Sequence, residues 1–144
     1  MDPRDFLKTA AHLKDQEGEH HTRSSMSRSY YAVHLHIRNF ISKTFLGERF
    51  FKNDLHQNVI NCLQQCEVRD IKEIGFKLDI LRQARTDADY KMNKNINPNK
   101  GHDTYDAADE LLSDFEDKLE ISENRQKFAA SSQLQARLQG ILPS

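Results

Sequence analysis

The sequence predicts an all-α protein, and three observations support this class. Apolar residues recur at three- and four-residue intervals along most of the chain. Only 5 Gly and 3 Pro interrupt the 144 residues, and Leu, Ala, Gln, Lys and Asp are common. A chain of this length suffices for one domain with a modest core. We therefore expect long helices in one domain.

The first helix is predicted to begin at Asp2 and Pro3. A carboxylate is a good N-cap, and proline fits the first helical position. The helix should end near Gly18, which makes residues 17–22, with their two adjacent histidines, a connection exposed to solvent.

The longest apolar pattern follows and predicts a second helix over residues 23–45, ending at Gly47. Its apolar stripe is wide, which indicates contact on more than one side, either within the protein or with a second subunit. The stripe comprises Met26, Tyr30, Val33, Ile37, Phe40 and Ile41, widened by Tyr31, Leu35 and Phe45.

Two helices are expected in the middle of the chain. Asp54 is predicted to cap a short helix whose apolar side runs to Cys66, and a further helix should run from about Ile71 to Tyr90. Cys62 and Cys66 lie four residues apart, where a disulfide within one helix would have poor geometry. We expect reduced thiols in the core.

The Asn-rich stretch of residues 93–103 is predicted to be a loop. Asp103 or Thr104 should then cap a fifth helix, which continues to Leu119. Residues 122–144 are predicted to form a helical appendage.

Charge and hydropathy limit the classes of function. The net charge is −1, and residues 101–144 carry 4 basic and 9 acidic residues. This balance argues against a protein that coats nucleic acid through bulk charge, although it permits a local basic cleft. Neither a membrane span nor a secretory signal is expected, so we predict a cytoplasmic protein. We also predict no metal, because the cysteine pair lacks further ligands, and no cofactor.

Two segments go beyond apolar spacing. Residues 23–34 read Arg-Ser-Ser-Met-Ser-Arg-Ser-Tyr-Tyr-Ala-Val-His, and residues 78–90 end in Ala-Asp-Tyr. The first segment is similar to the helix LR-x-A-x-SR-x-YYA-x-x-H, and the second to the helix L-x-x-LR-x-x-R-x-x-ADY, of the HEPN family in its small bacterial and archaeal form. With the order of these segments, the resemblance covers about residues 2–120.

The resemblance implies an antiparallel bundle of four to five helices, here residues 1–121, that commonly forms a homodimer. Family members include endoribonuclease toxins, partners of nucleotidyltransferases, components of defence systems, and RNA- or nucleotide-binding modules without activity. Fold is therefore better determined by the resemblance than function.

Active family members use an Arg-x(4–6)-His motif without metal. A histidine can move the proton of the ribose 2′-hydroxyl while an arginine stabilises charge on the phosphate. No histidine follows Arg85 at that spacing. Arg28 and His34 have the spacing in an earlier helix, but they project about 120° apart. The catalytic candidates are Arg28, His34 and Arg85.

The binding candidates for RNA or a nucleotide are Arg82, Arg85, Tyr90, Lys91 and Lys94. Simpler structural roles compete with this one. The arginines could pair with Asp87 or Asp89, the tyrosines could pack in the core, and a lysine-bearing loop is usually only well solvated.

Three hypotheses about function follow from the sequence. The first is a dimeric module that binds RNA, a nucleotide or a partner protein, for example a nucleotidyltransferase, in a toxin–antitoxin or defence system. The second is a metal-independent endoribonuclease. The third is a structural helical protein with no role in nucleic-acid binding.

Overall fold

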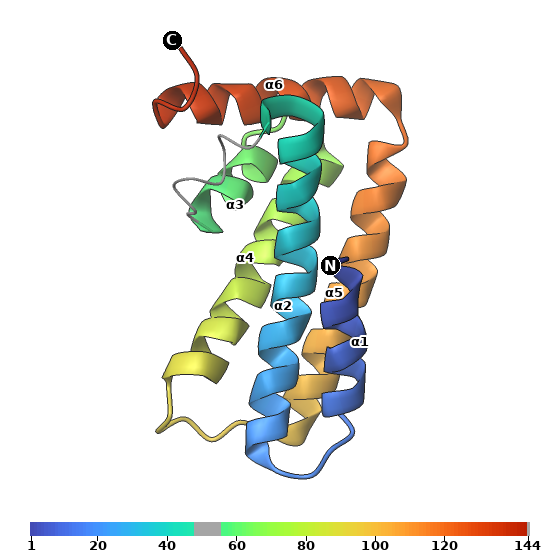
Figure 1. Cartoon of the computed structure of the whole chain (residues 1–144), viewed down its shortest axis with the longest axis vertical. Helices are drawn as coiled ribbons and strands as arrows, with labels where there is room; N and C mark the ends of the chain where they lie inside the picture. The colour runs from blue at the N-terminus through green and yellow to red at the C-terminus, as the bar shows by residue number, and fades with distance from the viewer. Residues whose placement is uncertain (48–55, 144) are drawn as a thin grey trace. The chain divides into compact units, whose positions relative to one another are not determined.

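Every regular element is a helix in the part of the chain that the structure describes, residues 1–47 and 56–143 of a computed structural model (Figure 1). The predicted all-α bundle with an extra C-terminal helix is thereby confirmed. Asp54 and Leu55 lie outside the described residues. In chain order the elements are α1 (Arg4–Leu13), α2 (Glu19–Ile41), the π-helical turn η1 (Ser42–Leu46), α3 (His56–Gln64), α4 (Arg69–Tyr90), α5 (Pro98–Leu119) and α6 (Ser122–Leu138).

The helices contribute to two compact units. The first unit comprises residues 1–36 and 78–112, and the second comprises residues 37–77 and 113–144. Helices α2, α4 and α5 each supply residues to both units. The predicted boundary at residue 121 is a different division of the chain and stays a prediction.

The core of the first unit is built by apolar residues at helical spacing. Met26, Ala88 and Ile96 form one buried cluster, which joins α2, the end of α4 and the segment before α5. The Ser25 hydroxyl of α2 donates a hydrogen bond to the Ala10 carbonyl of α1 at 2.9 Å. These contacts fix the helix ends that carry the motif residues.

The predicted start of α2 is wrong by four residues. The helix begins at Glu19, so the two histidines lie in its first turn rather than in a connection. The Gly18 carbonyl accepts hydrogen bonds from the His21 and Thr22 amides. A carboxylate at Glu19 favours the positive end of the helix dipole and also pairs with Arg23 at 2.9 Å.

The predicted loop over residues 93–103 is also too long. Helix α5 begins at Pro98, where proline is tolerated because its missing N–H has no partner in the first turn. The Asn97 side chain accepts a hydrogen bond from the Asn99 amide at 2.9 Å and caps the helix. Thr104 is inside the helix, where its hydroxyl donates to the Lys100 carbonyl, so the predicted cap at Asp103 or Thr104 is wrong.

The second unit has an aromatic centre. The Phe40 ring lies edge-on to Phe115 with centroids 5.4 Å apart, and the Phe45 ring lies edge-on to Phe128 at 5.7 Å. Helix α6 packs on α3, where the Ser131 hydroxyl donates to the Cys62 carbonyl at 2.8 Å. The helix predicted to reach residue 45 ends as α2 at Ile41 and continues as η1 to Leu46. Gly47 follows as the predicted terminator, with a φ of 67° that a residue with a side chain rarely adopts.

Cys62 and Cys66 are both buried as free thiols in this unit, as predicted. Burial raises the pKa of Cys62 to about 12 and also raises that of Cys66. Both sulfurs are therefore protonated at neutral pH. Across the described ranges no helix has the length and apolar character of a bilayer span.

Candidate functional site

The two motif segments meet in the first unit. The Ser27 hydroxyl of α2 donates a hydrogen bond to Asp89 Oδ2 of α4 at 3.2 Å. The same oxygen lies 3.7 Å from Arg85 Nη1. Asp89 therefore connects the Ser-Arg-Ser-Tyr-Tyr segment to the Ala-Asp-Tyr segment.

Arg85 is buried among tyrosine rings, with only 6% of its surface exposed. Its guanidinium carbon lies 5.4 Å from the ring centroids of both Tyr30 and Tyr31, and 5.7 Å from that of Tyr90. Its Nε has no hydrogen-bond partner among the described residues. A cation held this way is stabilised mainly by the ring faces and by one carboxylate, which is the structural role that competes with binding a phosphate.

The candidate pair Arg28 and His34 occupies two different environments. His34 is fully buried, and its ring stacks on Tyr30 at 5.4 Å between centroids. Arg28 is exposed, and its guanidinium lies 5.3 Å from the ring centroid of Phe6 in α1. His34 and Arg85 share contacts with Tyr30 and Tyr31, so these two candidates belong to one cluster and Arg28 does not.

Tyr90 ends α4 with 69% of its surface exposed. The expectation that it packs in the core is wrong, whereas Tyr30 is fully buried as expected. Tyr90 is the last residue of the helix, so one side of its ring is held near Arg85 while the rest faces solvent. The sequence pattern did not reveal this because apolar spacing loses its meaning at a helix end.

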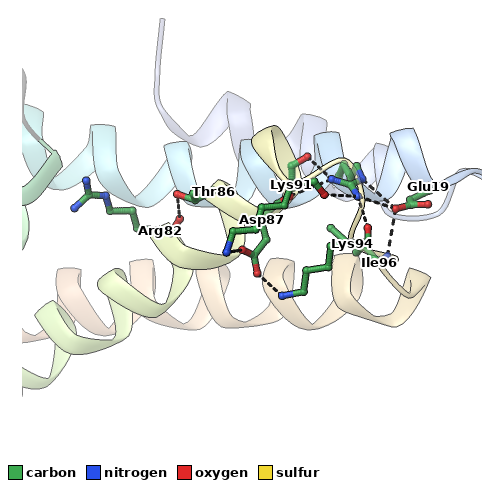
Figure 2. Close-up of polar contacts among 9 residues, drawn as sticks. Glu19, Arg82, Thr86, Asp87, Lys91, Lys94 and Ile96 are labelled. Carbon is green, nitrogen blue, oxygen red and sulfur yellow. Dashed lines mark hydrogen bonds and ion pairs between the residues drawn. The ribbon is translucent and has the colours of Figure 1, made fainter.

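Lys91 and Lys94 are both paired with Asp87 (Figure 2). Lys91 Nζ lies 2.9 Å from Asp87 Oδ1, and Lys94 Nζ lies 2.6 Å from Asp87 Oδ2. Hydrogen bonds from Lys94 and Lys91 lower the pKa of Asp87, so the carboxylate is ionised at neutral pH. Arg82 points away from this carboxylate in Figure 2.

Arg23 organises the end of α4, although it was not among the predicted site residues. Its Nη1 donates to the carbonyls of Asp87 and Ala88 at 3.0 Å, and its Nη2 donates to those of Lys91 and Lys94. These groups include carbonyls that the helix end leaves without a partner. Two features of the sequence could have pointed to it. Arg23 opens the segment of residues 23–34 that carries the resemblance, and it lies four residues after Glu19 on one helix.

Glu19 completes this arrangement. Its Oε1 accepts hydrogen bonds from Arg23 Nε at 3.0 Å and from the Ile96 amide at 3.2 Å (Figure 2). The bonds from Arg23 and Ile96 lower the pKa of Glu19. The segment that carries both lysines is therefore held at both of its ends by one Glu–Arg pair.

Two open depressions lie on the surface of the first unit near the end of α4. The first is lined by Asp79, Arg82, Gln83, Thr86, Asp87 and Lys91. The second is lined by residues 90–94. Lys91 belongs to both, so the binding candidates other than the buried Arg85 lie along one stretch of surface.

Over the described ranges, no three His, Cys, Asp or Glu side chains come together in a group that could hold a metal ion. Comparison with family models, curated proteins and solved structures finds no match for this chain. The resemblance to HEPN proteins therefore stays a prediction that depends on the two motifs.

Proposed function

We propose that this protein is a helical module that binds single-stranded RNA or a nucleotide at the C-terminal end of α4. The exposed ring of Tyr90 supports the proposal most directly. A base has a π-face that stacks on an aromatic side chain, and a nearby guanidinium such as that of Arg85 strengthens such a platform. Lys91, Lys94 and Arg82 supply positive charge for phosphates on the same surface.

Binding fits the candidate residues better than cleavage does. A general base must reach the ribose 2′-hydroxyl, and His34 is fully buried behind Tyr30. With four, five or six residues between, the positions that follow Arg85 are Tyr90, Lys91 and Met92, and none of them is a histidine. A metal-independent endoribonuclease is therefore the second candidate.

The resemblance to HEPN proteins extends the proposal to the assembly. It favours a homodimer, and it favours a setting such as a toxin–antitoxin or defence system in which a nucleotidyltransferase or another protein is the partner. Each of these features is proposed from the two motif segments alone.

Binding is tested by fluorescence anisotropy in EDTA, with a labelled single-stranded RNA, the same RNA as a duplex, and a labelled nucleotide. We expect the single strand to bind more tightly than the duplex, because stacking needs an accessible base face. Tyr90→Ala should weaken binding about 5- to 100-fold, the cost of one lost base–aromatic stack. Tyr90→Phe is the matched control, since it keeps the ring, and should bind within about twofold of the wild type.

The same samples distinguish the other hypotheses. RNA fragments with cyclic phosphate ends, absent when His34→Ala is used, would establish cleavage and overturn a binding-only function. No binding of any of the three ligands at low salt would overturn the proposal and favour a protein partner or a structural role.

A further inference from the structure

The Asp87 carboxylate occupies the position between two lysines that a phosphate would need. Its two oxygens contact different ammonium groups, at 2.9 Å for Lys91 and 2.6 Å for Lys94 (Figure 2). The Asp87 side chain is 22% exposed, whereas the Lys91 and Lys94 side chains are 60% and 56% exposed. The lysines thus reach in from solvent to a carboxylate that lies at the surface of the helix.

The backbone at Asp87 is fixed independently of its side chain. Arg23 Nη1 donates to the Asp87 carbonyl oxygen, and Arg23 Nη2 donates to the carbonyls of Lys91 and Lys94. The three residues are therefore held at their main chains whether or not the ion pairs form. Replacing the carboxylate should leave both lysines at the same place in the backbone, with their ammonium groups able to bind another anion.

A carboxylate with two ammonium donors resembles a bound phosphate in charge and in hydrogen bonding. Both anions accept charge-assisted bonds through separate oxygens, and a lysine binds either one as a point charge. Lys91 also lines both surface depressions, so a phosphate in either one is within reach of its ammonium group.

We propose that Asp87 is an internal competitor for phosphate and a determinant of specificity at this site. This inference deepens the proposed function, on which it rests, by assigning what limits phosphate contacts there. With Asp87 in place, a ligand is held mainly by stacking on Tyr90. A ligand phosphate reaches Lys91 and Lys94 only by displacing the carboxylate.

The test is Asp87→Asn, which keeps the shape of the side chain and removes its charge. Asp79→Asn is the matched control, because Asp79 lines the same depression and accepts a hydrogen bond from Gln83 at 3.3 Å, with no lysine paired to it among the described residues. Each substitution changes the net charge by the same amount. The probes are a labelled single-stranded RNA and inorganic pyrophosphate, with anisotropy and calorimetry as readouts.

We expect Asp87→Asn to tighten RNA binding about 3- to 30-fold, because it releases both lysines from their exposed ion pairs with the carboxylate. Asp79→Asn releases no lysine and should change RNA binding by less than about twofold. The dependence of affinity on salt should steepen by roughly 0.7 in the log–log slope for each lysine released. Adding Lys94→Ala to Asp87→Asn should cancel much of the gain. Pyrophosphate should bind measurably only to Asp87→Asn.

Each outcome decides between the inference and the function on which it rests. Equal effects of Asp87→Asn and Asp79→Asn would overturn the inference and indicate bulk charge, while the proposed function would stand if the wild type still binds RNA through Tyr90. Binding of RNA by Asp87→Asn but not by the wild type would support the inference that the carboxylate blocks the site, and would overturn the proposed function for the wild-type protein. No binding of RNA or pyrophosphate by any variant, with unchanged thermal unfolding, would overturn both.

Discussion

Arg23 and Arg85 are both largely buried, but different groups satisfy their charges. Arg23 donates hydrogen bonds to backbone carbonyls and to one carboxylate, whereas Arg85 lies against three aromatic rings and one carboxylate. Hydrogen bonds fix the first guanidinium in direction, and ring faces hold the second with less directional constraint. The first arrangement stabilises a helix end, and the second gives Tyr90 a charged support.

The burial of Cys62 and Cys66 predicts how fast their thiols react. At pH 8 the folded protein should react with a disulfide-exchange reagent much more slowly than the unfolded protein, because the thiolate is the nucleophile and burial raises the pKa of Cys62 to about 12. Both thiols should react within minutes in denaturant. Cys66→Ser leaves Cys62, the thiol whose pKa is raised to about 12, for separate measurement. Rapid reaction of this variant in the folded state would contradict the burial of Cys62.

Apolar spacing predicted most helices, but the local sequence around the helix ends gave wrong starts for α2 and α5. Asn- and Pro-rich residues before α5 are typical of loops, yet Asn97 and Pro98 are the cap and first residue of that helix. The helix α2 begins early because Glu19 pairs with Arg23 and with the Ile96 amide, a contact 77 residues away. No local pattern encodes such a partner.

The candidate site was predictable to a similar extent. Motif resemblance selected Arg85 and Tyr90, and the lysine-bearing stretch after the motif suggested Lys91 and Lys94. The structure places these residues on the last two turns of α4 and the segment after it. The role of Asp87 as the partner of both lysines was not apparent, because Lys94 lies seven residues on and beyond the helix end. Arg23 was missed for the same reason, as its carbonyl partners lie 64 to 71 residues away.

The Glu19–Arg23 pair gives a prediction for the element it supports. Arg23→Ala should lower the free energy of unfolding by about 2–3 kcal/mol, since it removes several charge-assisted bonds to helix-end carbonyls. Amide hydrogen exchange should accelerate most around Asp87 to Lys94. The matched control is Arg28→Ala on the same helix, which loses a ring contact at the surface and should cost under about 1 kcal/mol. An equal loss in the two variants, measured by urea unfolding, would contradict the assignment.

At the scale of the whole molecule, the charges nearly cancel, with 21 basic and 22 acidic residues. Long-range attraction of a polyanion is therefore weak, and affinity has to come from local contacts such as those near Tyr90. The stability of the protein depends on pH through the titratable groups whose pKa values change on folding.

Acidification should destabilise the protein in successive steps. Burial, and then the nearby Arg4, lower the pKa of His36 from 6.5, although Asp2 acts in the opposite direction. The unfolded chain therefore binds a proton at His36 more readily than the folded chain, so stability present above about pH 6.5 is lost as the pH falls through the folded pKa. Glu19 and Asp87, whose pKa values lie below 4.5 and 3.8, contribute stability that is lost at lower pH still.

Thermal unfolding measured from pH 8 to pH 3 tests this order. We expect a first decline of the melting temperature below about pH 6.5 and a steeper one below about pH 4.5, where the unfolded carboxylates take up protons. His36→Gln should remove the first decline and leave the second, because glutamine does not titrate. His20→Gln replaces an exposed imidazole on the same helix and should leave both declines unchanged. If the first decline persists in His36→Gln, another group causes it, and the half-buried imidazole of His36 does not control stability in this range.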